Sequence, residues 1–166
     1  DGGGLLETGA GGSAPKHVQQ LVEEGHLRWD SLGEFWALGE SLNFVAESTG
    51  NSKAGLLGKA VDAATQLLLA NDKSPSRRVG QTDTRDSHYY FALYWAQALA
   101  AQTEDQHLAN DFAGLAAALA DNEKTITAEL ASTQGKPCDL GGYYHAASDK
   151  VALVMRPSAT LNSIIG

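Results

Sequence analysis

The segment from Ser87 to Gln102 is apolar or aromatic on nearly every side when it is placed on a helix. The residues that give it this character are Tyr89, Tyr90, Phe91, Leu93, Tyr94, Trp95 and Leu99. A surface helix of a soluble protein keeps one polar face, so a helix that is apolar all round must be covered by neighbours on several sides. We therefore expect this helix to be the axis of the hydrophobic core.

Other segments have apolar residues at helical spacing and can supply the cover. Capping residues and turn signals predict three further helices before the central one: from Ser13 to Gly25, from Asp30 or Ser31 to Thr49, and after Asn51-Ser52. After the central helix, they predict a helix from a Thr103–Gln106 capping box through Leu119 and another from Asp121-Asn122 towards Gly135. A short helical stretch follows up to Met155, and a break at Pro157 ends it. Leu5 to Thr8 could end a short strand. The prediction is a mainly α fold of five or six helices with few or short strands.

The segment from Asn71 to Arg85 contains Pro75 and Gly80 and almost no large apolar residue. We expect it to be a loop, and it concentrates positive charge in Lys73, Arg77, Arg78 and Arg85. On its own, the pair Arg77-Arg78 is typical of a solvated basic turn.

Composition excludes several classes of protein. The chain has 166 residues, of which 43% are hydrophobic and 19% charged, which fits one globular domain. No apolar run approaches the roughly 20 residues of a membrane span, and no signal peptide is recognisable. The single cysteine excludes an intramolecular disulfide and fits a cytoplasmic protein. A net charge of −8 argues against nucleic-acid or anionic-membrane partners, so an anionic ligand requires a local basic pocket.

The glycine-rich run from Gly9 to Gly12 precedes the first predicted helix. Free backbone N–H groups and the helix dipole favour an anion at such a helix start, and Lys16 and His17 add side-chain donors. The alternative is a flexible loop before a capped helix. The run matches a dinucleotide fingerprint literally, but no apolar strand of useful length precedes it, and it lacks the Gly-Lys-Ser/Thr ending of a P-loop.

The histidines do not have the spacing of a zinc site, since none is paired four residues apart on one helix. Apart from His17, we expect them to have surface or hydrogen-bonded packing roles: His26, His88, His107 and His145. The acidic residues are scattered, with Asp83 and Asp86 on either side of Arg85 in the expected loop. The sequence therefore gives no support for a magnesium site made by this chain alone.

Blocks along the whole chain resemble the monomeric class of NADP-dependent isocitrate dehydrogenase, in the family order. The run from Gly11 to His17 is similar to the adenine-side cofactor loop of the β-decarboxylating dehydrogenases. The further blocks are Asp1–Leu5, Glu7–Ala10, Arg28–Phe35, Lys73–Arg77, Tyr94–Gln102, Gly135–Pro137, Asp139 with Gly141–Tyr144, and Met155–Thr160.

The resemblance implies a set of cofactor-binding residues. His17 and Arg28 match the family residues that grip the 2′-phosphate of NADP, and Arg77 matches a further phosphate contact. Asp30 matches a residue of the same pocket. The surrounding loop positions are Gly12, Ser13, Ala14 and Lys16. A dianionic phosphate requires cationic donors, and arginine supplies a planar fork suited to it.

The resemblance also implies the parent activity, which is oxidation of isocitrate to 2-oxoglutarate with NADPH formation in the tricarboxylic acid cycle and the glyoxylate bypass. Members are several times longer, so we expect residues 1–166 to be one unit, the C-terminal cofactor-binding part of the smaller α/β domain of a cytoplasmic, monomeric enzyme. The ligands for Mg²⁺ or Mn²⁺, the isocitrate contacts and the catalytic residues are expected upstream of this chain, so that the chain alone is inactive. The alternative is a non-catalytic helical bundle that binds another phosphorylated ligand.

Overall fold

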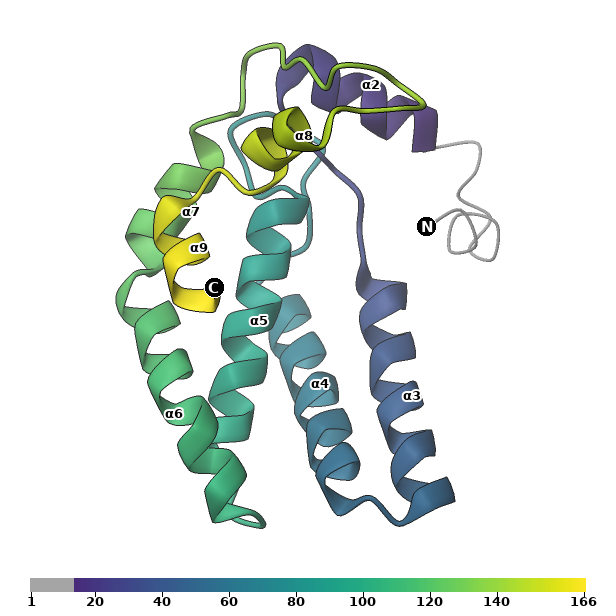
Figure 1. The fold of residues 1–166 in the computed structure, drawn as a ribbon, viewed down its shortest axis with the longest axis vertical. Coiled ribbons are helices and arrows are strands. Elements are labelled where there is room, and N and C mark those ends of the chain that lie inside the picture. Colours follow the sequence, from purple (N-terminus) through teal and green to yellow (C-terminus); the bar gives the residue numbers. More distant parts are fainter. Residues whose placement is uncertain (1–13) are drawn as a thin grey trace.

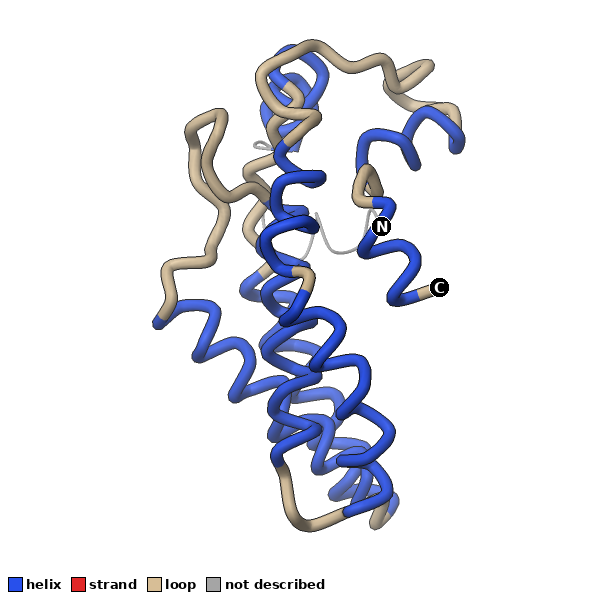
Figure 2. Tube along the Cα trace, turned by 90° about the vertical axis from the view of Figure 1, so that its left-hand side faces the viewer, coloured by secondary structure: helices blue, strands red, loops and turns tan. Residues whose placement is uncertain are grey.

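The computed structural model describes residues 14–166, and every regular element in that range is a helix (Figures 1 and 2). The mainly α prediction is therefore confirmed. The residues expected to end a short strand, Leu5 to Thr8, lie outside the described residues.

Four long helices run up and down beside one another (Figure 1). They are α3 (Leu32–Thr49), α4 (Ser52–Ala70), α5 (Thr84–Ala101) and α6 (Gln106–Asp121). Sequential neighbours are in contact, α3 with α4, α4 with α5 and α5 with α6. Short links between α3 and α4 and between α5 and α6 force each of these pairs to pack antiparallel, whereas a longer loop over residues 71–83 connects α4 to α5.

The remaining helices gather around one end of these four (Figure 1). They are α2 (Ala14–Glu24), α7 (Glu123–Ala131), α8 (Ser148–Met155) and α9 (Ala159–Ile165). The Glu129 carboxylate on α7 holds α9 in place, accepting hydrogen bonds from Ser158 Oγ at 2.6 Å and from Thr160 N at 3.1 Å. Residues 14–166 thus contain eight helices, more than the five or six expected.

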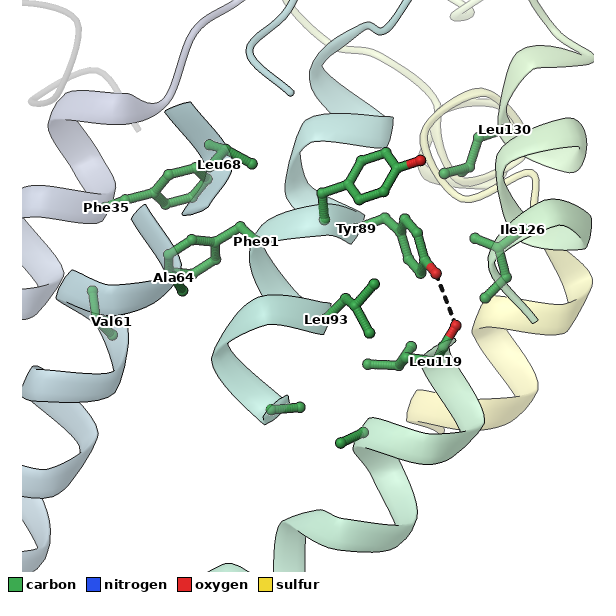
Figure 3. Close-up of a cluster of buried hydrophobic side chains, with 13 residues drawn as sticks. Phe35, Val61, Ala64, Leu68, Tyr89, Phe91, Leu93, Leu119, Ile126 and Leu130 are labelled. Carbon is green, nitrogen blue, oxygen red and sulfur yellow. Dashed lines mark hydrogen bonds between the residues drawn. The ribbon is translucent and has the colours of Figure 1, made fainter. Parts of the chain in front are cut away.

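Helix α5 is the axis of the core, as its sequence predicts (Figure 3). The Phe91 ring stacks on Phe35 of α3, with ring centroids 3.9 Å apart. On the other side of α5, the Tyr89 hydroxyl donates a hydrogen bond of 2.8 Å to the carbonyl of Leu119 on α6. Burying a tyrosine requires such a partner for its hydroxyl, so the aromatic residues fix the position of α5 between two neighbours.

Helices α3 and α4 approach closely where both carry glycine. A Cβ atom added at Gly39 would lie 2.7 Å from Asp62 Oδ1, and one added at Gly58 would lie 2.3 Å from Asn43 Oδ1. The Gly58 position is also 3.3 Å from the backbone oxygen of Gly39. Because glycine has no side chain, these two positions allow α3 and α4 to pack at this short distance.

Two helix starts differ from the prediction. Helix α6 is capped by Asp105, whose side chain accepts from Leu108 N at 3.0 Å, and not by Thr103. Helix α5 starts at Thr84 with a capping box in which the Asp83 and Asp86 side chains accept from backbone N–H groups. The expected loop therefore ends before Arg85, which belongs to the first turn of α5.

Among the described residues, no helix is both long and apolar enough to cross a membrane.

Candidate functional site

The first turn of α2 carries the basic side chains that the sequence analysis assigns to an anion site. Lys16 is exposed and His17 is half-buried, and this turn contains no acidic residue. The helix dipole places partial positive charge at the same end. Gly12 and Ser13 lie outside the described residues, and Ala14 is the first residue of α2.

His17 lies beside the segment that carries Arg28. Its ring packs edge-on against the indole of Trp29, with centroids 5.4 Å apart. Partial burial, and then the positive charge of Arg28, lower the pKa of His17 below its usual 6.5. The imidazole is therefore neutral at pH 7 and available to gain a proton when an anion approaches.

Three buried polar side-chain atoms have no hydrogen-bond partner within residues 14–166, and they cluster here. They are His17 Nδ1, Gln20 Oε1 and Arg28 Nε. Buried polar groups in folded proteins are nearly always paired, so a cluster of unpaired ones calls for a ligand or another partner. Gln20 lies one helical turn after His17, and that spacing could have identified it from the sequence.

The turn with Arg77 also meets α2. The Gln20 side-chain amide donates to the backbone carbonyl of Arg77 at 3.2 Å, while the Arg77 side chain is exposed. Helix α2 therefore brings together His17, Arg28 and the Arg77 turn, although 57 positions separate Gln20 from Arg77.

Asp30, predicted as part of the same pocket, has a structural contact of its own. It is exposed, and its Oδ1 accepts from Leu32 N at 3.1 Å at the start of α3. This hydrogen bond satisfies one free N–H of that helix.

The start of α5 holds the backbone that carries Arg28. Thr84 Oγ1 donates to the carbonyls of Leu27 and Trp29 at 2.9 and 2.6 Å, and Leu27 N donates to Asp83 Oδ2 at 3.2 Å. These hydrogen bonds hold the backbone on both sides of Arg28 against the start of α5.

Arg85 reinforces this attachment, which corrects its assignment to a loop. It is 5% exposed, pairs with Asp83, and donates to the carbonyl of Gly25 at 2.7 Å. Gly25 ends α2 with a φ of +62°, and a Cβ there would lie 2.1 Å from Thr133 O, so only glycine fits. Local sequence could not show this burial, since the partners of Arg85 come from distant segments.

A pocket of about 950 Å³ lies beside His17, and its wall is largely apolar. Helices α2, α5 and α9 contribute to it together with the 27–31 segment. The lining includes His17, Leu27, Trp29, Tyr89, Met155 and Leu161. An apolar pocket edged by a few polar groups is the usual form of a site for a small molecule. In the part of the chain described, no group of three histidine, cysteine or acidic side chains could hold a metal ion.

The amino-acid sequence is similar to those of known proteins. The family described as monomeric isocitrate dehydrogenase matches residues 1–166. The chain is 60% identical to isocitrate dehydrogenase [NADP] 2 of Mycobacterium tuberculosis and 59% identical to isocitrate dehydrogenase [NADP] of Azotobacter vinelandii. Each match covers 99% of this chain and 22% of the relative, so the chain spans about a fifth of their length. The chain belongs to the monomeric isocitrate dehydrogenase family.

Proposed function

We propose that this chain is the NADP-recognition part of an isocitrate dehydrogenase, and that His17, Arg28 and Arg77 bind the 2′-phosphate of the cofactor. Gly12, Ser13, Ala14 and Lys16 form the surrounding loop, with Asp30 at its edge. The relatives are named as NADP enzymes, and this supports the choice of cofactor. It disfavours the alternative of a non-catalytic bundle.

The unpaired buried nitrogens of His17 and Arg28 are the observation that carries the proposal. A phosphate dianion accepts several hydrogen bonds at once, and charge-assisted bonds to guanidinium are among the strongest in proteins. NAD lacks the 2′-phosphate and gains none of these contacts. The site therefore selects between cofactors through the charge on one group.

In the full-length enzyme, NADP would supply the hydride acceptor, and Mg²⁺ or Mn²⁺ would supply a Lewis acid for the decarboxylation. The part of this chain is to bind and orient the adenine end of the cofactor. The described residues form no metal site, and we place the metal ligands and the isocitrate contacts in the part of the longer enzyme that lies outside this chain.

We propose further that residues 1–166 act as one unit within the smaller domain of a monomeric, cytoplasmic enzyme. Because we place the metal ligands and the isocitrate contacts outside this chain, the isolated chain is expected to form no NADPH from isocitrate. An assay of the pure chain, free of host enzyme, tests this, and isocitrate-dependent NADPH formation would contradict it.

The cofactor assignment is tested in the full-length enzyme by replacing His17 and Arg28 together with alanine. Each charge-assisted contact is worth roughly 1.5–3 kcal/mol, so the preference for NADP over NAD in kcat/KM should fall by about two to four orders of magnitude. A matched control replaces exposed residues of the same types, His107 and Arg78, and should leave the preference unchanged. Equal losses with both cofactors would show that His17 and Arg28 support the fold without reading the phosphate.

A further inference from the structure

His26 is completely buried, and both nitrogens of its ring are within hydrogen-bond distance of an oxygen. Nδ1 is 2.9 Å from Gln134 Oε1, and Nε2 is 2.8 Å from the backbone oxygen of Ser76. From the sequence we expect a surface or hydrogen-bonded packing role for this residue, and the contacts show the second of these. Their geometry says more about the ring itself.

Both partners of the His26 ring are acceptors. The Ser76 carbonyl can only accept, and the orientation of the Gln134 amide is set by the backbone around it. Gln134 Oε1 accepts from Gly80 N at 2.7 Å, while Gln134 Nε2 donates to Gln81 O at 3.0 Å. A neutral imidazole has one N–H and satisfies one of the two oxygens. The proton on Nε2 donates to Ser76, and a proton on Nδ1 would donate to Gln134.

The contact between His26 and Ser76 connects the two segments that carry the arginines of the proposed phosphate site. His26 lies two residues before Arg28, and Ser76 lies immediately before Arg77. The two guanidinium groups carry like charges, so they repel one another when no anion is present. Apart from the His26 contact, the Ser76 backbone is held by a bond of 2.7 Å from its own N–H to Thr82 O, within the same loop.

We propose that His26 is a positioning residue that ties the loop carrying Arg77 to the segment carrying Arg28 and so preorganises the two arginines for one phosphate. The inference rests on the proposed function, since it assumes that both arginines meet the same group. His26 is completely buried, so its effect on affinity acts through the spacing of the arginines. Preorganisation of this kind strengthens binding by removing the cost of ordering the loop.

Two amide substitutions separate the two contacts. In His26→Asn the amide nitrogen lies near the place of Nδ1 and keeps the contact with Gln134, while the link to Ser76 is lost. In His26→Gln the amide nitrogen reaches the place of Nε2 and keeps the link to Ser76. Each variant keeps one of the two contacts, so a difference between them reports the direct link to Ser76.

The experiment measures dissociation constants for NADP and NAD by calorimetry in the full-length enzyme. We expect His26→Asn to weaken NADP binding about tenfold and His26→Gln about threefold or less, with NAD binding unchanged in both. A loss that is equal in the two variants, or equal for the two cofactors, would overturn the inference. A purely structural role would not produce the split between NADP and NAD.

The failure of this inference is distinguishable from failure of the proposed function. If Arg28→Ala and Arg77→Ala each lower NADP affinity while the two His26 variants behave alike, the phosphate site stands and the positioning role falls. If neither arginine variant changes NADP affinity, the proposed function falls first. Neutron diffraction on the wild-type enzyme gives an answer that needs no variant, because deuterium on Nε2 supports the hydrogen bond to Ser76 and its absence from Nε2 excludes this bond.

Discussion

Asp83 and Arg85 form an ion pair that is almost entirely shielded from solvent, with side chains 1% and 2% exposed. The same guanidinium donates to Thr133 Oγ1 at 2.6 Å and to the carbonyl of Val154 at 2.8 Å, so it joins the starts and ends of several helices. Replacing Arg85 with methionine leaves the Asp83 carboxylate buried without its partner. We expect Arg85→Met to lower the free energy of unfolding by about 3–5 kcal/mol, measured by urea denaturation.

The exposed pair of Lys59 and Glu104 is the control for this prediction. Their charged atoms are 3.0 Å apart, but the side chains are 68% and 62% exposed, and water screens the attraction. Lys59→Met should therefore cost less than about 1 kcal/mol. Similar losses for the two variants would show that the buried pair contributes no more than a surface one.

Arg77 and Arg78 are neighbouring exposed cations, and the proposed site uses the first alone. In the full-length enzyme we expect Arg77→Ala to raise the dissociation constant for NADP at least about tenfold, the equivalent of roughly 1.4 kcal/mol. Arg78→Ala removes the same charge next to it and should change binding little. Calorimetric titration compares the two, and indistinguishable variants would mean that only the overall charge of the loop matters.

Binding of NADP is expected to be linked to protonation of His17. Burial and the charge of Arg28 lower the pKa of the free imidazole, whereas a phosphate dianion favours the charged form and raises it. When NADP binding raises the pKa of His17, the complex takes up a proton from solution. The affinity for NADP should therefore increase as the pH falls from about 8 to 6. Calorimetry in two buffers of different ionisation enthalpy should show greater proton uptake by the wild type than by His17→Gln. The same uptake in both would exclude His17 as the group that titrates.

Asp86 should make the folded state less stable at higher pH. Its pKa is raised to about 6, chiefly by burial, so between pH 4 and 6 the folded state holds a proton that the unfolded state releases. Stability is then lost as the pH rises through this range. Asp86→Asn removes the penalty and should stabilise the protein by up to about 3 kcal/mol above pH 6, with no gain near pH 4. Denaturation curves at pH 4 and 8 test this, with the exposed Asp111→Asn as a control that should show no pH-dependent gain.

The positions of the helices could be predicted from the sequence wherever local capping and turn residues determine them. The Asn51 side chain accepts from Ala54 N, and Gly50 ends α3 in a left-handed conformation, so the turn between α3 and α4 lies where the sequence predicts it. Helix α9 could not be found in this way. It has seven residues, too few to show a periodic pattern, and it is held by Glu129 from a distant part of the chain.

Burial of charge was the harder property to predict. Arg77 and Arg85 occupy similar polar surroundings in the sequence, yet one is exposed and the other is almost fully buried. The difference comes from Gly25, Thr133 and Val154, which approach Arg85 only after the chain has folded. The residues of the phosphate site came from the family resemblance, whereas their shared attachment to α2 required the structure.

The close approach of α3 and α4 at Gly39 and Gly58 reverses a common rule of protein engineering. Alanine in place of a helical glycine usually raises thermal stability by up to about 1 kcal/mol, and Gly114 on α6 should obey the rule because nothing lies within 4 Å of an added methyl group. At Gly58 the same methyl group would meet Asn43 and the backbone of Gly39. If glycine-to-alanine variants were chosen from helix propensity alone, the substitution on α6 would therefore stabilise the protein, and the substitution at Gly58, where α3 and α4 approach closely, would destabilise it.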